Sequence, residues 1–320
     1  MEKFISYLQS KNLAQSSINH YTDYTSKFFT YTSKEAEQVE KKDVLKYLQY
    51  LQDKKGYENI TRRNHLIALN HYFTFLLKNE QVTSNPTALI KIRGANKKHL
   101  YKTYTPEELT QLYDSYYHTF LANFDTLCYA PKLGGIQTNQ IEQTFLSRQR
   151  NYAMLGLLLY QGLRTNELQK IQVDDIDLNK AQLNIIAKKK INGRKIPLNA
   201  SQIGALMIYL NDTRPKLLNY QHDQENKQLF LPLPEASKDK TNSTQVLHTL
   251  KPLTRHIKKL DKHFLNFRQT RASVITHWIQ QHGLRKAQYY AGHKYISTTE
   301  NFLPNDMESL SDDIAKYNPF

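Results

Sequence analysis

The sequence of 320 residues contains a single cysteine, a single tryptophan, ten glycines and ten prolines. The one cysteine, Cys128, cannot form a disulfide within the chain or build a cysteine-rich metal cluster, which favours a reducing compartment. The apolar runs, such as Met154–Tyr160, are far shorter than the ~20 residues that span a bilayer, and the first residues lack the apolar core of a signal peptide. We therefore expect a soluble cytoplasmic protein.

Acidic residues are scarce relative to basic ones. The chain has 29 aspartates and glutamates against 44 lysines and arginines, which gives a formal net charge of +15. In a compact chain these excess positive charges repel one another, and a polyanionic partner, above all nucleic acid, relieves that repulsion. A soluble basic protein without such a partner is the alternative. The length suits two domains, each large enough to bury a core.

The first domain, residues 1–90, is predicted to be a bundle of four short helices. Apolar side chains recur at helical spacing in four successive segments, and Ser16 and Thr61 lie near helix starts, as N-capping residues do. Asn85 and Pro86 end the bundle, because the residue before a proline is disfavoured in a helix. The apolar residues include Phe4, Leu8, Ile18, Phe28, Val44, Leu48, Leu51, Leu66, Leu69, Phe73 and Leu76.

Residues 91–104 are interpreted as a basic linker between the domains. The segment is rich in lysine and contains an arginine and a glycine. It is either a solvated tether or a strap that crosses the DNA backbone, whose phosphates attract such side chains. The candidate DNA-binding residues here are Lys91, Arg93, Lys97, Lys98 and Lys102.

The second domain, residues 105–320, is predicted to be mainly α-helical with a small antiparallel sheet. It opens with Thr105 as a helix N-cap, followed by proline. Residues 183–198 are predicted to form a β-hairpin with Asn192 and Gly193 as its two-residue turn. The expected helices cover residues 150–160, 200–210 and the region from about Arg271 onward.

Two motifs carry the residues that suggest chemistry. The heptapeptide Gly-Leu-Arg-Thr-Asn-Glu-Leu contains Arg164 and Glu167. Further on, His293 follows Arg271 by 293 − 271 = 22 positions, and Phe302 follows His293 by 302 − 293 = 9. Permanently charged guanidinium groups are well suited to neutralise phosphate oxygens that gain negative charge. A surface ion pair is the alternative for the first motif, and a structural histidine is the alternative for the second.

These motifs resemble those of the tyrosine recombinases, the phage-integrase and Xer-like enzymes that exchange DNA strands. The box Arg-Ala-Ser-Val-Ile, which begins at Arg271, is most similar to that of recombinases from Bacteroidetes mobile elements. The resemblance covers nearly the whole chain. It implies an N-terminal, SAM-like core-binding domain of four helices and an α-rich catalytic domain. It also implies strand cleavage through a 3′-phosphotyrosyl intermediate, with no metal, ATP or other cofactor.

The resemblance assigns roles to residues of this sequence. Arg164 and Arg271 match the two arginines of the family, and Glu167 matches the carboxylate that braces the site. His293 in Ala-Gly-His matches the second histidine position. The resemblance implies that the phosphate to be cleaved is held and neutralised by Arg164, Lys189, Arg268, Arg271 and His293.

Two positions of the resemblance are less regular. Counting back from the end of the hairpin puts the catalytic lysine at Lys189, with Lys188 as the alternative, because a slip of one residue changes the face of a strand. Where the family usually has a histidine, this sequence has Arg268, which donates to a phosphate oxygen but cannot accept a proton. Further DNA-binding candidates near the hairpin are Lys188, Lys190 and Arg194.

The main departure from the family is Phe302, which stands at the position of the nucleophilic tyrosine. Ser297 and Glu300 have the spacing of a capping box, which predicts that Phe302 lies about one turn into a short helix. A phenylalanine has no oxygen, so the chain as written cannot form a phosphotyrosyl bond. We favour the explanation that a tyrosine was substituted at this position, which stops the reaction before cleavage. The alternative is a relative that naturally does not cleave DNA.

The resemblance implies a bacterial, nucleoid-associated site-specific recombinase that integrates, excises or inverts a mobile element. Its partners would be double-stranded DNA with inverted-repeat sites and further copies of itself, forming a homo-tetramer in the synapse from monomers in solution. The tail, residues 304–320, is expected to dock on a neighbouring subunit or on its own domain.

The first alternative function is that of a non-catalytic DNA-binding or architectural protein. The second is a metal-dependent nuclease, disfavoured because such close carboxylates suit a loop edge better than a two-metal site; its candidates are Asp174, Asp175 and Asp177.

Overall fold

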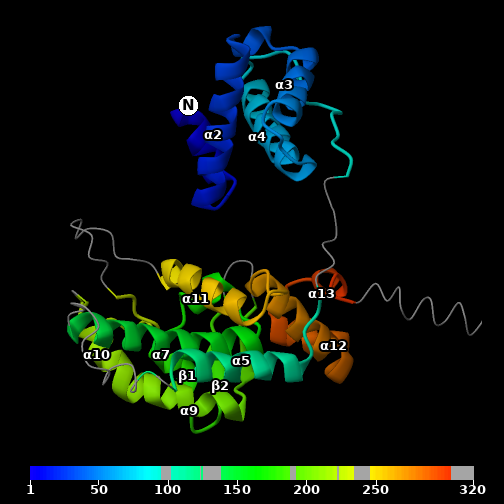
Figure 1. Cartoon of the computed structure of the whole chain (residues 1–320). Helices are drawn as coiled ribbons and strands as arrows, with labels where there is room; N and C mark the ends of the chain where they lie inside the picture. Colours follow the sequence, from blue (N-terminus) through cyan, green and yellow to red (C-terminus); the bar gives the residue numbers. More distant parts are fainter. Residues whose placement is uncertain are drawn as a thin grey trace, which may run out of the picture. The chain divides into compact units, whose positions relative to one another are not determined.

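A computed structural model of the chain shows two compact units, Met1–Leu100 and Tyr101–Phe320 (Figure 1). Each unit has its own hydrophobic core and is described by itself. Over the residues that it describes, the structure is mostly helical with a small antiparallel sheet, which confirms the predicted fold class. The structure describes residues 1–94, 102–122, 124, 138–187, 192–221, 223–233 and 246–303.

The N-terminal unit contains the four predicted helices. Aromatic and aliphatic side chains from all four are buried, with Phe4, Phe28, Tyr47 and Phe73 at most 1% exposed. The helices are α1 (Glu2–Ser10), α2 (Gln15–Thr32), α3 (Lys41–Asp53) and α4 (Asn59–Lys78), with the short 3-10 helix η1 (Ala36–Gln38) before α3.

The predicted N-caps of the N-terminal unit are wrong. Ser16 and Thr61 lie inside α2 and α4, whose N-cap residues are Ala14 and Glu58. The carbonyl of Ala14 accepts hydrogen bonds from the backbone N–H groups of Ser17 and Ile18. These two helices therefore begin two (16 − 14) and three (61 − 58) residues earlier than the side-chain signal suggests, without a side-chain cap.

Both ends of the segment interpreted as a linker attach to the units. At one end, the Asn59 side chain donates to the carbonyl of Arg93 (3.0 Å), within the N-terminal unit. At the other, the Gln269 side chain donates to the carbonyl of Lys102 (3.1 Å), and the backbone N–H of Tyr104 donates to Ser273 Oγ (2.8 Å). Residues 95–101, including Lys97 and Lys98, lie outside the described residues.

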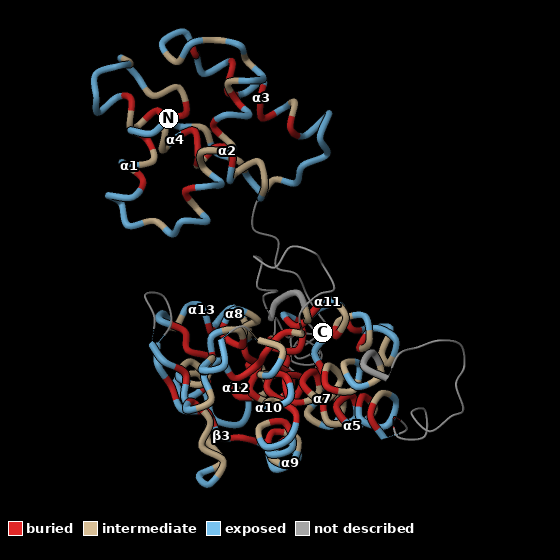
Figure 2. The backbone as a smooth tube through the Cα atoms, turned by 90° about the vertical axis from the view of Figure 1, so that its left-hand side faces the viewer, coloured by how far each residue is buried: buried red, intermediate tan, exposed pale blue. Residues whose placement is uncertain are grey.

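The C-terminal unit is built around α7. Every apolar side chain from Ala153 to Leu159 is at most 1% exposed, and the buried stretches gather around α7 and α12 (Figure 2). Among the described residues, no helix is both long and apolar enough to cross a membrane. The principal helices are α5 (Pro106–Phe120), α7 (Thr138–Tyr160), α9 (Ala200–Ile208), α11 (Val246–Leu260) and α12 (Phe267–Ala291), with the shorter α8 (Thr165–Leu168), η2 (Val173–Asp175), the π-helix η3 (Tyr209–Thr213), α10 (Arg214–Leu218) and α13 (Ile296–Glu300).

The small sheet has three antiparallel strands in the order β1 (Ile176–Asp177), β2 (Gln182–Ile185), β3 (Arg194–Pro197). The predicted two-residue turn at Asn192 and Gly193 is wrong, because Ile185 pairs with Arg194 and residues 186–193 connect the strands. This register places Leu183 opposite Ile196, with both side chains buried. Burial of one face of a strand fixes its register more strongly than a local turn preference does.

Helix α12 begins at Phe267 rather than near Arg271. The side chain of Asn266 caps it by accepting from the backbone N–H of Arg268 (2.9 Å). Gly283, with φ 76° and ψ 167°, interrupts the helix, and Gly292, with φ 64°, ends it. These backbone angles favour glycine, so the two glycines direct the chain from the buried half of α12 back toward His293.

The N-cap of α5 offers a test of the fold. Thr105 Oγ1 accepts from the N–H of Glu108 (3.2 Å), whose carboxylate accepts from the N–H of Thr105 (2.9 Å). Thr105→Ala removes one half of this box and is expected to lower the free energy of unfolding of the C-terminal unit by about 1 kcal/mol. Urea unfolding followed by the fluorescence of Trp278, the chain's single tryptophan, measures the change. The exposed Thr103 provides the control, because Thr103→Ala leaves the cap intact; equal losses in both variants would contradict the assignment.

Candidate active site

Arg164 lies at the N-terminus of α8, just after the turn that ends α7. Its backbone N–H donates to Glu167 Oε2 (2.9 Å) and its guanidinium donates to Glu167 Oε1 (3.1 Å). The Arg164 side chain is 33% exposed, whereas that of Glu167 is 4% exposed. The carboxylate therefore anchors an arginine whose guanidinium still reaches solvent.

Arg271 is buried and joins the two sequence motifs. Its guanidinium donates to the carbonyl of Gly162, to the carbonyl of Ala291 (2.8 Å) and to His293 Nε2 (3.3 Å). Burial, followed by the nearby charge of Arg164, lowers the pKa of Arg271 to about 9, which leaves it protonated at neutral pH. The structure thus holds a positive charge inside the unit, oriented by three hydrogen bonds to fixed acceptors.

His293 is 3% exposed. An arginine can only donate a hydrogen bond, so His293 Nε2 accepts from Arg271 and Nδ1 carries the proton. Nδ1–H then donates to Thr299 Oγ1 (3.0 Å). Burial, then the positive charge of Arg271, lowers the pKa of His293 to about 4, so the imidazole is neutral at pH 7.

Phe302 lies beside this histidine. The two rings are stacked, with centroids 5.6 Å apart and an interplanar angle of 17°. The carbonyl of Phe302 accepts from Thr276 Oγ1 on α12 (3.1 Å). The predicted capping box at Ser297 is wrong: Tyr295 is the N-cap of α13, which makes no side-chain cap, and the helix ends at Glu300. Phe302 therefore lies in the turn that follows this short helix, because α13 ends at Glu300.

The structure thus brings together the residues of both motifs. Residues 136–309 match the sequence model of the phage integrase family, and residues 1–83 match that of the phage integrase N-terminal SAM-like domain. The chain belongs to the phage integrase family. This confirms the resemblance to tyrosine recombinases.

Curated relatives of this family member are similar over almost their whole length. The tyrosine recombinase XerC of Natranaerobius thermophilus is 27% identical, with 99% of this chain and 97% of the relative covered. The XerC of Bacillus subtilis is 23% identical, with 99% and 95% covered.

Two solved structures share the fold. The XerH site-specific recombinase, bound to a palindromic difH substrate in a post-cleavage complex, has a TM-score of 0.65 and 20% identity, covering 95% of this chain and 81% of its own. A tyrosine-to-phenylalanine variant of the Tn1549 transposon integrase, in complex with transposon right-end DNA, has a TM-score of 0.63 and 14% identity, covering 99% and 98%. At these identities the likeness concerns the fold alone.

The other residues that the sequence predicted for the active site or for DNA binding in this phage integrase family member are not part of this cluster as described. Arg268 is exposed one helical turn before Arg271, on the surface of α12. Lys91 and Arg93 are exposed in the N-terminal unit, and Lys102 pairs with Glu108 (3.2 Å). The candidates Lys188, Lys189 and Lys190 and the tail, residues 304–320, lie outside the described residues.

Arg194 differs from the prediction that it binds DNA. Its side chain is fully buried and forms a two-point ion pair with Glu167, from Nη1 to Oε1 (3.0 Å) and from Nη2 to Oε2 (3.1 Å). Alternation along a strand puts residues 194 and 196 on the same face, so the apolar Ile196 is the sequence signal that could have identified Arg194 as inward-facing.

The carboxylates considered for a metal nuclease have local partners. Asp175 Oδ2 accepts from the N–H of Gln172 (2.8 Å), and Asp177 pairs with Lys180 (3.3 Å). Among the described residues, no group of three or more histidine, cysteine, aspartate or glutamate side chains is arranged to hold a metal ion.

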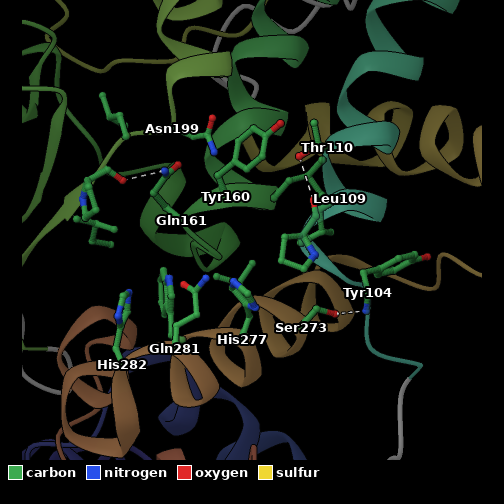
Figure 3. Close-up of a pocket in the computed structure, with 17 residues that line it drawn as sticks. Tyr104, Leu109, Thr110, Tyr160, Gln161, Asn199, Ser273, His277, Gln281 and His282 are labelled. Atoms are coloured by element: carbon green, nitrogen blue, oxygen red, sulfur yellow. Dashed lines mark hydrogen bonds between the residues drawn. The ribbon is translucent and has the colours of Figure 1, made fainter.

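A pocket of about 360 Å³ lies on another face of α12. Ser273, His277 and Gln281 of α12 lie along one side of it, and Tyr160 and Asn199 lie on the opposite side (Figure 3). None of the two motif arginines, His293 or Phe302 lines it. The pocket is therefore separate from the candidate active site.

The neutral state of His293 predicts a pH dependence of stability. The unfolded chain takes up a proton at the ordinary histidine pKa of about 6.5, whereas the folded chain does so only near 4. Stability is therefore lost as the pH falls from 6.5 toward 4. Urea unfolding between pH 7 and pH 5, followed by Trp278 fluorescence, is expected to show a smaller loss in His293→Gln than in the unchanged chain.

The control for this measurement is the exposed His263. His263→Gln should retain the pH dependence of the unchanged chain. If His293→Gln retains it as well, the protonation state assigned to His293 is incorrect.

Proposed function

We propose that this chain has the active-site architecture of a site-specific DNA recombinase and that position 302 is its nucleophile position. The observation that carries the proposal is the convergence of Arg164, Arg271, His293 and the ring of Phe302 in one place. A phosphodiester bound there would meet two guanidinium groups. The partner is double-stranded DNA, in keeping with the DNA-bound complexes of the relatives that share the fold.

The proposed chemistry is transfer of a DNA strand to the protein. Attack by a tyrosine oxygen at residue 302 would form a bond to phosphorus, giving a 3′-phosphotyrosyl link, and break the bond to the 5′ oxygen, which leaves with a proton. The phosphodiester energy is kept in the new bond, so religation needs no ATP. The phosphorane-like transition state gains negative charge, which preorganised guanidinium donors stabilise.

The fixed hydrogen bonds suggest separate roles for the charged side chains. Arg271 supplies charge from a buried, oriented position, and the more exposed Arg164 is placed to contact a phosphate oxygen directly. Arg268, exposed on α12, is proposed as a further donor to the DNA phosphate, but an arginine side chain has no acceptor for the proton of a phenol. Activation of the phenol would therefore rest on the phosphate, on solvent or on His293, whose Nε2 accepts from Arg271 before any substrate binds. Lys189 is the proposed acid that protonates the leaving oxygen.

Phe302 stops this sequence of steps before cleavage, because it offers no oxygen to attack phosphorus. We infer that the chain binds its DNA site and holds it uncleaved, as the form of a recombinase in which phenylalanine replaces tyrosine. The native reaction would integrate, excise or invert a mobile element at inverted-repeat sites, with four subunits in the synapse. A DNA-binding protein without catalysis is the competing function, favoured by the same residue.

Phe302→Tyr is expected to restore cleavage. The chain as written would first select its binding sites from random duplex DNA, and those sites would then be nicked to make suicide substrates that trap the covalent intermediate. The tyrosine variant should form an adduct that survives denaturing electrophoresis, and mass spectrometry should place the DNA on residue 302.

Two controls make this result specific. Phe302→Leu should form no adduct, because it keeps an apolar side chain without an oxygen. Phe302→Tyr combined with Arg271→Lys should bind DNA yet form far less adduct, because lysine cannot reproduce the fixed guanidinium contacts. A Phe302→Tyr protein that binds the selected sites without forming an adduct would favour the non-catalytic function.

DNA binding should depend steeply on salt. Neutralisation of several phosphates by lysines and arginines releases condensed counterions, so affinity should fall on the order of 10³-fold between 50 and 200 mM salt. Titration of the selected duplex by fluorescence anisotropy at several salt concentrations measures the slope. Lys91→Gln and Arg93→Gln, both at exposed positions, should each make the slope shallower; a salt-independent affinity would argue against DNA as the partner.

A further inference from the structure

Arg194 connects the sheet to both motifs of the candidate active site. It lies on the inner face of β3, opposite Ile185. Its guanidinium meets both oxygens of Glu167 in the first motif, and its Nε donates to the carbonyl of Tyr290 (2.7 Å) near the end of α12. One buried side chain therefore links three segments that are distant in the sequence.

The contact with the second motif is unusually close. A side chain at Gly292 would begin 2.6 Å from Arg194 Nη1 and 2.9 Å from its Cζ, which is too close for non-bonded atoms. Gly292 also has φ 64°, so two independent features favour glycine here. The guanidinium thus packs directly on the backbone turn that carries His293.

Glu167 receives hydrogen bonds from both arginines. Its Oε1 accepts from Arg164 (3.1 Å) and from Arg194 (3.0 Å), and its Oε2 accepts from Arg194 (3.1 Å) and from the backbone N–H of Arg164 (2.9 Å). Burial alone would raise the pKa of Glu167, but the hydrogen bonds and charge of Arg194 more than offset it, and the pKa lies below its usual range. The carboxylate is therefore ionised and occupied on both oxygens.

We propose that Arg194 is a positioning residue for strand cleavage, which acts by fixing Glu167 and thereby the guanidinium of Arg164. The proposal rests on the recombinase function proposed above. Arg194 itself is buried, and in this proposal it acts without touching the DNA. Without the two-point ion pair from Arg194, the buried Glu167 carboxylate would keep Arg164 as its remaining ion-pair partner. It would then draw the Arg164 guanidinium away from the phosphate. A displacement of about 1 Å in such a group costs on the order of 100-fold in rate.

The geometry requires an arginine rather than any cation. A guanidinium presents two parallel donors to a carboxylate and a third to another acceptor, whereas an ammonium group is a point charge on a flexible stem. Arg194→Lys keeps a positive charge near Glu167 but loses the fork or the bond to Tyr290. It should therefore have a smaller effect than Arg194→Met, which loses the charge as well.

The first experiment does not need cleavage. In the chain as written, the side-chain N–H signal of Arg164 in a ¹H–¹⁵N spectrum, assigned by its absence in Arg164→Lys, reports on its pairing with Glu167. We expect Arg194→Met and Arg194→Lys to shift this signal. An unchanged Arg164 signal in a folded Arg194 variant would overturn the proposal.

The matched control is Arg150→Met. Arg150 is another buried arginine of the same unit, and it donates to the carbonyl of Leu231 (3.0 Å) and to the Asn151 side chain, away from the candidate site. Its loss should also destabilise the unit, as measured by Trp278 fluorescence, but leave the Arg164 signal in place. If Arg150→Met shifts that signal equally, Arg194 contributes stability only and the positioning role is overturned.

The second experiment measures cleavage in the Phe302→Tyr background. Arg194→Met is expected to lower the single-turnover rate of adduct formation about 100-fold while changing the Kd for uncleaved DNA less than about threefold. Glu167→Gln should act similarly, and the double variant should be no slower than the worse single variant, because residues that act as a unit have non-additive effects. The proposal would be overturned if the rate losses of the two single variants multiplied in the double variant. It would also be overturned if Arg194→Met left the rate of adduct formation unchanged.

The two experiments separate this inference from the function on which it rests. If Phe302→Tyr forms no adduct, the recombinase function fails, and the Arg164 signal still decides whether Arg194 positions that side chain. If the adduct forms and the Arg164 signal does not respond to Arg194, the recombinase function stands and the positioning role fails.

Discussion

The site depends on one buried guanidinium, that of Arg271. Its donors reach the turn after α7 through Gly162, the end of α12 through Ala291, and the imidazole of His293. An unpaired cation inside a protein would be costly, and here oriented backbone carbonyls and a neutral imidazole surround it. Because its acceptors come from separate segments, the charge is stable only when these segments meet. The fold of the unit and the assembly of the site are in this sense one event.

Much of the architecture follows from the sequence because it rests on strong, repeated signals. Helical periodicity located the four N-terminal helices and the second half of α7, which begins at Thr138 rather than near Arg150. The resemblance of two motifs to those of the tyrosine recombinases singled out Arg164, Arg271 and His293, which the structure brings together. The errors concern local signals that tertiary contacts override. Asn192 and Gly193 favour a tight turn, yet the burial of Leu183 and Ile196 sets a register with a longer connection. Ser297 has the spacing of a cap, yet α13 starts at Ile296 without one.

Arg194 shows why charge alone misleads. On the sequence it belongs to a basic segment of a basic protein, and a surface role follows naturally. Its position beside Ile196 in an alternating strand is the better guide, because the strand buries every second residue. The partner that makes burial tolerable, Glu167, lies in a motif 194 − 167 = 27 positions earlier, and no local pattern connects the two. Long-range pairing of this kind becomes visible only in three dimensions.

The attachment of Phe302 has an evolutionary consequence. This residue is held by its main-chain carbonyl through Thr276 and by the flat face of its ring against His293, and neither contact involves the atom that would react. The contacts that hold the ring in place would therefore be the same for a tyrosine, since they use the backbone and the ring face. Codons for phenylalanine and tyrosine differ by one base, so under the proposed function a single mutation at this position would separate a form without the nucleophile from a form with it.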